Sequence, residues 1–273
     1  MAVSWFVAAL VQGGTWGGGL VNGTVLNIVL GVASSAVSAA LAWVLQASLR
    51  RRSLERKRAF FGMRAGTECL IVAPRKAGSA VEERVVAQRD VYAMMELAAL
   101  VRECGAEAEI IGAGEVRQGV GGRAEFCIGG PLANERTAAH LRWRLPGVSA
   151  TAEWEAGVNE LIVGDRSYTR EKGLVEYVLL ARITGGEGER PTFLVCGQTA
   201  TSNLAAVRVL SRRHRELIRA HGPRGTFALL LRVVQPGAYG PDVVEFVADV
   251  TAQASAPRPA AGPAPDPDPV RAA

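Results

Sequence analysis

The first 49 residues contain no Asp, Glu, Lys or Arg, and this charge-free segment limits the fold more than any other feature of the chain. Within it, residues 25–45 form an unbroken run of uncharged, mostly apolar side chains. At about 1.5 Å per residue, a helix of this length crosses roughly 30 Å of hydrocarbon. We therefore predict one transmembrane helix over residues 20–48, preceded by a short extracytoplasmic N-terminus, residues 1–19.

A basic cluster follows the apolar run and predicts its orientation. Residues 50–58 contain six basic side chains against Glu55 alone, a net charge of +5 that equals the net charge of the whole chain. Lys and Arg favour the cytoplasmic side of a membrane, so we expect the N-terminus outside and the main domain in the cytoplasm. We interpret residues 49–62 as a basic juxtamembrane linker that could also attract anionic lipid headgroups. The remaining chain is charge-balanced, which disfavours nucleic acid as a partner.

Two further interpretations of the apolar run depend on its details. A cleaved signal peptide would need a basic segment before the apolar one, and residues 1–6 have no basic side chain, so a retained anchor is favoured. Gly31, Ser35 and Ala39 recur at four-residue spacing, which would allow close helix approach and a homo-oligomer through the transmembrane helix. An alanine-rich helix also produces such stripes by chance.

From Glu68 onwards, short apolar runs alternate with helical patterns. The predicted strands are residues 69–73, 108–111, 126–128, 176–183, 192–196, 227–234 and 243–250, and the predicted helices are residues 89–103, 134–145 and 203–221. This alternation predicts an α/β fold over residues 63–252, a Rossmann-like, mostly parallel sheet with helices on both faces. Residues 148–152 and 160–163 are expected to form antiparallel strands of an insertion at the sheet edge, with a hairpin turn at Gly164-Asp165. Residues 253–273 are predicted to be a disordered Pro/Ala-rich tail.

Two turns rich in glycine and polar residues follow predicted strands, and they are the best candidates for a ligand site. In an open α/β sheet, ligands lie outside the carboxyl ends of the strands, where glycine allows close approach and helix N-termini attract anions. The first turn supplies Gly129, Gly130, Asn134, Arg136 and Thr137, and the second supplies Gly197, Gln198, Thr199, Thr201 and Asn203. Gly185, Gly186 and Glu187 end another strand, and Arg75 and Lys76 a further one; these are expected to line the rim.

A structural interpretation of the same turns stays open. Neither turn matches the dinucleotide-binding or P-loop pattern, so no cofactor is indicated. On this interpretation the glycines make tight turns, while Asn134 and either Ser202 or Asn203 cap helices.

The four cysteines predict neither a disulfide framework nor a metal site. Cys69, Cys104, Cys127 and Cys196 form no Cys-x-x-Cys pair and have no His at metal-ligand spacing. We expect buried thiols in a reducing compartment. The alternative is a nucleophilic Cys127 or Cys196 beside one of the glycine turns.

Three phrases of the sequence, residues 127–134, 183–187 and 196–200, resemble those of predicted membrane-anchored proteins from high-GC bacteria. The resemblance covers about residues 60–250 together with the apolar segment. It implies one Rossmann-like domain behind a single helix, and it implies no catalytic residue.

Three functional hypotheses follow. The first is a membrane-anchored cytoplasmic α/β domain that binds a small anionic ligand, nucleotide-like ligands included, in a sensory or regulatory role. The second is a hydrolase or transferase that acts on a phosphorylated or glycosidic substrate through Glu135, Arg136 or Glu187. The third is a membrane scaffold with no ligand. The sequence lacks the G-x-S-x-G pattern of a serine nucleophile elbow.

Overall fold

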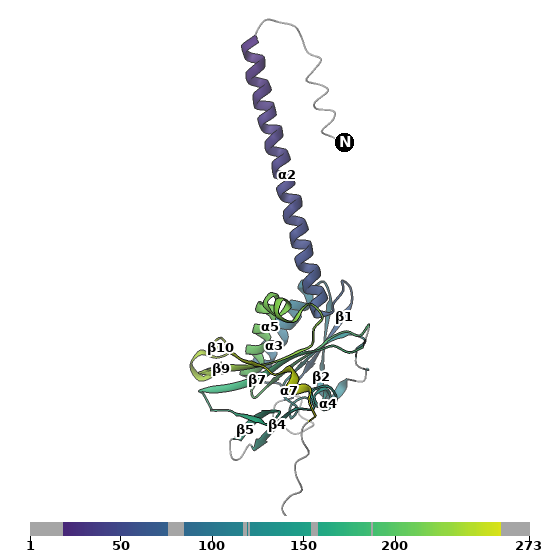
Figure 1. Cartoon of the computed structure of the whole chain (residues 1–273), viewed down its shortest axis with the longest axis vertical. Coiled ribbons are helices and arrows are strands. Elements are labelled where there is room, and N and C mark those ends of the chain that lie inside the picture. Colours follow the sequence, from purple (N-terminus) through teal and green to yellow (C-terminus); the bar gives the residue numbers. More distant parts are fainter. Residues whose placement is uncertain are drawn as a thin grey trace, which may run out of the picture. The chain divides into compact units, whose positions relative to one another are not determined.

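The computed structural model describes residues 19–75, 85–116, 119, 121–153, 158–186 and 188–257. The chain divides into two compact units, Met1–Ser53 and Leu54–Ala273, and each is described by itself. The elements in chain order (Figure 1) are α2 (Gly19–Phe61), β1 (Glu68–Ala73), α3 (Gln88–Glu103), β2 (Glu107–Gly112), η1 (Ala113–Glu115), β3 (Ala124–Ile128), α4 (Glu135–Arg144), β4 (Val148–Glu153), β5 (Val158–Val163), β6 (Arg166–Thr169), β7 (Val175–Ile183), β8 (Thr192–Gly197), α5 (Ala200–His221), β9 (Phe227–Val234), α6 (Pro236–Tyr239), β10 (Val244–Asp249) and α7 (Thr251–Ser255).

The first unit holds the part of α2 that was predicted to span a membrane. Every side chain from Val25 to Leu45 is exposed. Within the described part of the chain, this is the one helix long and apolar enough to cross a membrane, a test that a signal sequence also passes. The hydroxyls of Ser34 and Ser35 both donate to the carbonyl of Gly31, so these polar groups are satisfied inside the helix. Association through the small-residue stripe stays a prediction.

The second unit is built on a seven-stranded sheet with the strand order β10-β9-β7-β8-β3-β1-β2 (Figure 1). β1 pairs in parallel with β2 and with β3, and β3 pairs in parallel with β8. The predicted alternation of strands and helices is therefore confirmed, and so is a mostly parallel sheet. A Rossmann-like fold in the narrower sense stays a prediction.

β7 departs from the predicted parallel arrangement. It runs antiparallel to both of its neighbours, β8 and β9, and β10 runs antiparallel to β9. A parallel neighbour would need a crossover connection of a dozen or more residues, and the short segment 184–191 cannot provide it. The carboxyl end of β7 therefore lies where β8 begins, with Ile183 opposite Thr192.

Both faces of the large sheet are covered. Helices α3 and α5 pack together on one face, while α4, α7 and a small sheet lie on the other (Figure 1). Side chains alternate between the two layers along each strand: Cys69 and Ile71 of β1 enter the first core, and Leu70 and Val72 enter the second. The inner strands of the sheet are buried on both faces, which explains their nearly continuous apolar sequences, whereas the outermost strands β2 and β10 are largely exposed.

The small sheet corresponds to the predicted insertion. β4, β5 and β6 form a separate antiparallel sheet, and the predicted turn at Gly164-Asp165 joins β5 to β6. The predicted strands and turn are confirmed, but the location at the sheet edge was wrong. Val148, Leu161 and Val163 are buried in the second core, against residues of the large sheet. An antiparallel sheet with one apolar face has to cover that face, and here a face of the large sheet does so.

The start of α5 and the end of the folded domain each differ from the prediction by about one helical turn. α5 begins at Ala200, because Thr199 rather than a later residue caps it. The fold also continues beyond residue 252, since α7 runs to Ser255 and Ala254 is fully buried. The part of the predicted tail from residue 258 onwards lies outside the described residues.

The last turns of α2 are part of the core of the second unit. α2 runs to Phe61 without a break, so the predicted linker of residues 49–62 is helical up to that point. Phe60 and Phe61 are fully buried, with ring centroids 5.7 and 5.4 Å from that of Phe193. Gly62 then ends the helix at φ 66°, and a Cβ there would lie 2.1 Å from Cδ of Pro191. Glycine is therefore required at this position on both grounds.

Arg182 of β7 fastens this helix end to the sheet. Only 2% of the residue is exposed, and it is the largest fully buried side chain of the described residues. Its Nε donates to the carbonyl of Phe60 over 3.0 Å, while Nη1 and Nη2 donate to the carbonyls of Gly225 (2.7 Å) and Pro223 (3.2 Å). Burial lowers the pKa of Arg182 to about 10, so the guanidinium stays charged at neutral pH.

We expect Arg182→Met to destabilise the protein by about 3–5 kcal/mol, because three buried carbonyls lose a charged donor. The matched control is Arg232→Met on the neighbouring strand β9, where Arg232 is 44% exposed and pairs with exposed Glu245. That change should cost less than about 1 kcal/mol. Thermal and chemical unfolding of the full-length protein in detergent measures both. Equal losses would contradict the anchoring role of Arg182.

Candidate functional site

The two predicted glycine turns lie next to each other at one edge of the large sheet. β3 and β8 are parallel neighbours, with Ile128 opposite Val195, so both strands end at the same edge. Gly129 adopts φ 95°, a conformation that favours glycine, and its amide donates to the carbonyl of Val195 over 2.8 Å. A Cβ on Gly130 would lie 3.5 Å from the carbonyl oxygen of Gly197. The expected proximity of the two turns is therefore confirmed.

The side chain of Asn134 in the first turn is occupied by contacts within the protein, whereas the buried Oγ1 of Thr137 has no hydrogen-bond partner among the described residues. Asn134 is fully buried, and its Oδ1 accepts from the amides of Arg136 (3.0 Å) and Thr137 (3.1 Å), which caps α4. Its Nδ2 donates to the carbonyls of Ile128 (2.8 Å) and Val72 (3.3 Å). Thr137 is fully buried behind this cap. Asn134 thus has no hydrogen-bonding capacity left for a ligand.

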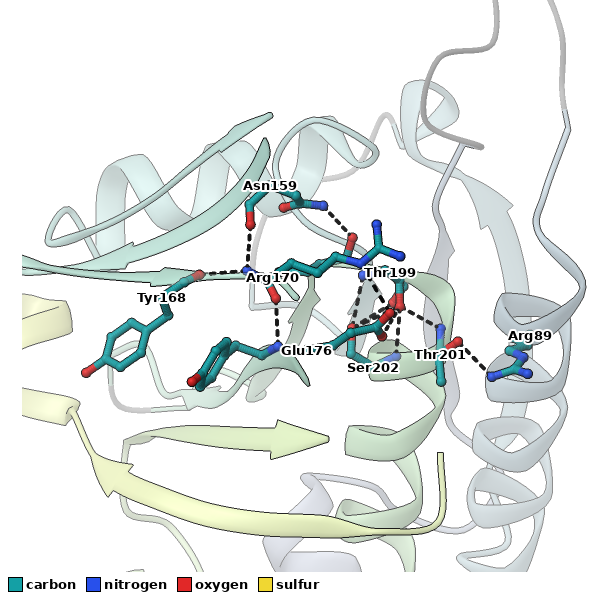
Figure 2. A network of polar contacts seen from close by, with 10 residues as sticks. Arg89, Asn159, Tyr168, Arg170, Glu176, Thr199, Thr201 and Ser202 are labelled. Carbon is teal, nitrogen blue, oxygen red and sulfur yellow. Dashed lines mark hydrogen bonds and ion pairs between the residues drawn. The ribbon is translucent and has the colours of Figure 1, made fainter. Parts of the chain in front are cut away.

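Gln198 of the second turn connects the small sheet to β7. Its Nε2 donates to the carbonyls of Tyr168 (2.7 Å) and Asn159 (3.0 Å), and its Oε1 accepts from the amide of Tyr177 (2.7 Å). The carbonyl of Gln198 in turn accepts from Nδ2 of Asn159 over 2.7 Å. Figure 2 shows Asn159 and Tyr168 on one side of this network. The amide of Gln198 is therefore a structural link between the sheets.

Thr199 caps α5 at the centre of the same network (Figure 2). Its Oγ1 accepts from the amides of Thr201 (3.1 Å) and Ser202 (3.3 Å). The hydroxyl donates to the carboxylate of Glu176, which is buried and also accepts from Nε of Arg170 over 3.3 Å. A carboxylate at this helix N-terminus opposes the binding of an anion there, because it already supplies the negative charge that the helix dipole favours.

Asn203 joins the second turn to α3. Its Oδ1 accepts from the amide of Gly197 over 2.9 Å, and its Nδ2 donates to Oδ1 of Asp90 over 2.9 Å. Burial raises the pKa of Asp90, and the hydrogen bond from Asn203 opposes that rise. The polar groups of both turns thus point inward, and the contacts support the structural interpretation of tight turns and helix caps.

The third predicted group lies at the opposite edge of the sheet. Gly185 and Gly186 follow β7, whose last residue, Ile183, pairs with Thr192 at the start of β8. Their grouping with the two glycine turns was wrong, because it assumed that β7 runs parallel to its neighbours. Glu187 lies outside the described residues.

A cavity of about 840 Å³ opens at this opposite edge. Its wall consists of the end of α2 with the residues that follow it, the segment after β7, and Arg224 in the turn after α5. The segment after β7 contributes the predicted residues Gly185 and Gly186. The charged residues of the lining are Arg58, Arg64, Arg182, Arg190 and Arg224, with Glu55 and Glu189. Among the described residues of the lining, five arginines against two glutamates give a net charge of +3.

The arginines of this cavity differ in how far their guanidinium groups are occupied. Arg182 binds only backbone carbonyls, and no carboxylate among the described residues pairs with it. Arg58 and Arg190 donate to the carbonyls of Cys104 (2.7 Å) and Gly62 (2.9 Å). In the described part of the chain, the exposed side chains of Arg64 and Arg224 have no hydrogen-bond or ion-pair partner. We call the cavity lined by these five arginines the arginine cavity.

A second polar cluster lies beneath α4. Glu125 of β3 is 3% exposed, and its carboxylate accepts from Nε (2.8 Å) and Nη2 (2.9 Å) of Arg136. Nε2 of His140 and Sγ of Cys127 each lie 3.0 Å from Oε1 of the same carboxylate. Burial by itself raises the pKa of Glu125, but the hydrogen bonds from His140, Arg136 and Cys127 outweigh it and lower the pKa to about 2. The carboxylate is therefore ionised, and Nε2 of His140 is the donor.

This cluster resembles a metal site only in its donor atoms. Glu125, Cys127 and His140 place one oxygen, sulfur and nitrogen within 4.8 Å of one another, and zinc uses these donors. Arg136 already neutralises the carboxylate through two hydrogen bonds. Burial also raises the pKa of Cys127 well above its ordinary value, which opposes the thiolate that a metal requires. These contacts describe a buried ion pair.

The residues expected to act in catalysis do not converge in the described part of the chain. Glu135 forms a surface ion pair with Arg75, whose amide donates to the carbonyl of Ala133 in the first turn. Arg136 lines a separate cavity of about 410 Å³ together with His140, Trp143 and Arg144. Glu187, the third of these candidates, lies outside the described residues, as does Lys76, which was expected to line the rim.

The cysteines are core residues. All four are buried and free, and burial raises the pKa of Cys69 and of Cys196 to about 12. A buried thiol with a raised pKa is a poor nucleophile. These contacts favour the interpretation as structural thiols over a nucleophilic Cys127 or Cys196.

The sequence contains a signal for two of the buried charged residues that were not predicted as part of a polar cluster. Arg182 interrupts the apolar run of residues 176–183, and Glu125 adjoins the apolar residues 126–128. A charged residue in a buried strand persists only where it is paired or hydrogen-bonded, so such a position marks a polar cluster. Arg64 and Arg224 carry no such signal, because they lie in turns where charged residues are common.

Comparison of the chain with protein-family models, with curated proteins and with solved structures finds no match. The resemblance to membrane-anchored proteins of high-GC bacteria therefore stays an expectation.

We expect Gly197→Ala to destabilise the protein by about 1–3 kcal/mol. A Cβ there would lie 2.5 Å from Oδ1 of Asn203, 2.6 Å from Oγ of Ser202 and 2.9 Å from the amide nitrogen of Asn203. The control is Gly130→Ala, whose Cβ would meet its nearest neighbours at an ordinary 3.5–3.6 Å. Thermal unfolding of both variants checks this, and an equally large loss for Gly130→Ala would contradict it.

The Glu125 cluster predicts a specific form of acid sensitivity. The pKa of Glu125 is depressed in the folded state, so its contribution is fully present above the ordinary pKa near 4.5 and is lost as the pH falls towards 2. Glu125→Gln should lower the free energy of unfolding at pH 7 by up to about 3 kcal/mol. Between pH 5 and 2, the variant should lose correspondingly less stability than the wild type. Unfolding measured against pH tests this, with the exposed Glu107→Gln as control. Parallel pH profiles for wild type and Glu125→Gln would rule the assignment out.

Proposed function

We propose that this protein is a single-pass membrane-anchored α/β domain that binds a small anionic ligand in a sensory or regulatory role. We place the ligand in the arginine cavity, and no longer at the two glycine turns. The observation that carries the proposal is the buried guanidinium of Arg182, which lines a cavity of about 840 Å³ without a carboxylate partner among the described residues.

The charges of the cavity support an anionic ligand. Buried or half-buried cations in proteins are normally paired with carboxylates. Here five arginines face two glutamates, and one of these, Glu189, already accepts from the amide of Gly186 over 3.0 Å. An anion between the arginines would supply the missing counter-charge. The guanidinium fork suits phosphate and carboxylate groups, because it donates two parallel hydrogen bonds.

The size of the cavity supports a small molecule. Ligand pockets in proteins commonly measure about 300–1,000 Å³. A cavity of about 840 Å³ therefore suits a ligand of metabolite size. The described residues of the lining include no His, Cys or Asp, so they offer few groups for proton transfer or nucleophilic attack. This composition favours binding over the hydrolase or transferase alternative, and the net positive charge of the described lining favours it over a scaffold without a ligand.

Anchoring in a membrane is supported by α2. Its side chains from Val25 to Leu45 are apolar or small and exposed, and Arg50 is the first charged residue of the chain. A helix of this kind is stable in lipid, whereas in water it would expose a large apolar surface. The basic residues that follow favour a cytoplasmic position for the α/β domain.

The proposal predicts that pyrophosphate binds the full-length protein in nanodiscs of neutral phosphatidylcholine. At 100 times its Kd, the ligand should add about 2.7 kcal/mol to stability, which thermal unfolding detects. Arg64→Gln/Arg224→Gln should weaken binding more than about tenfold, since it removes two charged donors without touching the core.

The matched control is Arg142→Gln/Arg166→Gln, which removes the same charge from exposed positions outside the arginine cavity. Its affinity for pyrophosphate should equal that of the wild type. If pyrophosphate, inorganic phosphate and nucleotides all leave the stability unchanged, or if both double variants lose affinity equally, the proposed function is wrong.

A further inference from the structure

We infer that the ligand of the arginine cavity is a compact polyanion that carries two or more phosphate groups and no aromatic base, such as an oligophosphate or a sugar bisphosphate. This inference rests on the proposed function and narrows its ligand class. It replaces the nucleotide-like ligand that the sequence suggested.

The lining lacks the groups that recognise a nucleobase. No Phe, Tyr, Trp or His, and no Asn or Gln, is among the described residues that line the cavity. Proteins hold bases by stacking them on aromatic rings and by hydrogen bonds from side-chain amides and backbone to base edges. The apolar side chains among the described lining residues are those of Met63, Pro191 and the alanines. A base would gain little in this cavity beyond what its phosphates gain.

The cations are spread around the cavity, which favours several phosphates over one. Arg58 and Arg64 come from the end of α2 and the turn after it, Arg182 and Arg190 from β7 and the segment that follows, and Arg224 from the turn after α5. Several phosphates would let each guanidinium form its own pair of parallel hydrogen bonds with phosphate oxygens. A net lining charge of +3 matches a ligand with two or three negative charges.

The glycine segment after β7 leaves room for phosphate oxygens. A Cβ on Gly186 or on Gly188 would meet nothing within 4 Å, so the backbone borders open space at both positions. Gly185 is different, because a Cβ there would lie 1.2 Å from Oε2 of Glu189. Glu189 itself is engaged, since it accepts from Gly186 and lies 3.6 Å from Nη2 of Arg144. Its charge is thus partly offset by groups of the protein.

Phosphate groups of this kind have two sources, a soluble metabolite and the headgroup of an anionic phospholipid. The basic residues before the cavity make the lipid source plausible, because polybasic segments attract anionic leaflets. The chemistry recognised is the same in both cases. The experiment therefore has to separate the sources.

The test is isothermal titration calorimetry of the full-length protein in neutral nanodiscs with tripolyphosphate, ATP and adenosine. Tripolyphosphate is expected to bind as tightly as ATP, within about threefold, and adenosine should not bind. Arg64→Gln/Arg224→Gln should weaken tripolyphosphate and ATP by the same factor. If ATP binds more than about tenfold tighter than tripolyphosphate, the base is recognised, and this inference fails while the proposed function stands.

A second arm compares thermal stability in neutral nanodiscs and in nanodiscs that contain cardiolipin, an anionic phospholipid with two phosphate groups, with no soluble ligand added. Stabilisation that is lost in Arg64→Gln/Arg224→Gln but kept in Arg142→Gln/Arg166→Gln supports the inference and assigns the phosphate to lipid. Equal stability in both lipids, with tripolyphosphate binding intact, supports it with a soluble source. If neither tripolyphosphate, ATP nor anionic lipid acts through Arg64 and Arg224, both the inference and the proposed function are overturned.

Discussion

The hydrogen bonds of Arg182 hold together three parts of the domain that are far apart in sequence. One guanidinium reaches the end of α2 at Phe60, the loop before β9 at Pro223 and Gly225, and its own strand β7. Burial lowers its pKa to about 10 from an ordinary 12.5, which corresponds to roughly 3 kcal/mol of preference for the neutral form. Three carbonyl oxygens and the face of the Phe60 ring, 5.4 Å from Cζ, oppose that preference. The packing of the end of α2, at Phe60, against the sheet therefore depends on keeping a costly charge inside the domain.

The two edges of the large sheet use their polar groups in opposite ways. At the carboxyl ends of β3 and β8, Asn134, Gln198 and Asn203 direct their amides inward, where they cap helices and link layers. Saturated groups of this kind stabilise the turns but cannot exchange their partners for a ligand without loss. At the other edge, Arg64 and Arg224 have no partner among the described residues. A glycine-rich turn at a strand end can therefore indicate a tight backbone turn as readily as a ligand-binding site.

Local sequence patterns predicted most of the fold and little of the candidate site. The apolar runs of β1, β3 and β8 and the turn at Gly164-Asp165 are encoded by neighbouring residues, and the structure has them where they were expected. The direction of β7 is not encoded in this way, because an apolar run reads the same in a parallel and in an antiparallel strand. Because β7 is antiparallel to β8, Gly185 and Gly186 lie at the end of the sheet opposite the two glycine turns and cannot share a site with them. Convergence of arginines from three distant segments depends on tertiary packing, so no local pattern could reveal it.

Binding of the proposed anion in the arginine cavity and docking of the α2 end would be thermodynamically linked. Arg190 donates to the carbonyl of Gly62, and Arg182 donates to that of Phe60, so the cations that line the cavity also hold the helix end. A bound anion would reduce the cost of burying Arg182 and thereby stabilise the packing that buries it. By reciprocity, the docked helix end must bind the anion more tightly than a displaced one does. Because the apolar segment belongs to the same helix, this coupling would relate ligand binding to the part of the chain that is proposed to enter the membrane, which is the property that a regulatory role requires.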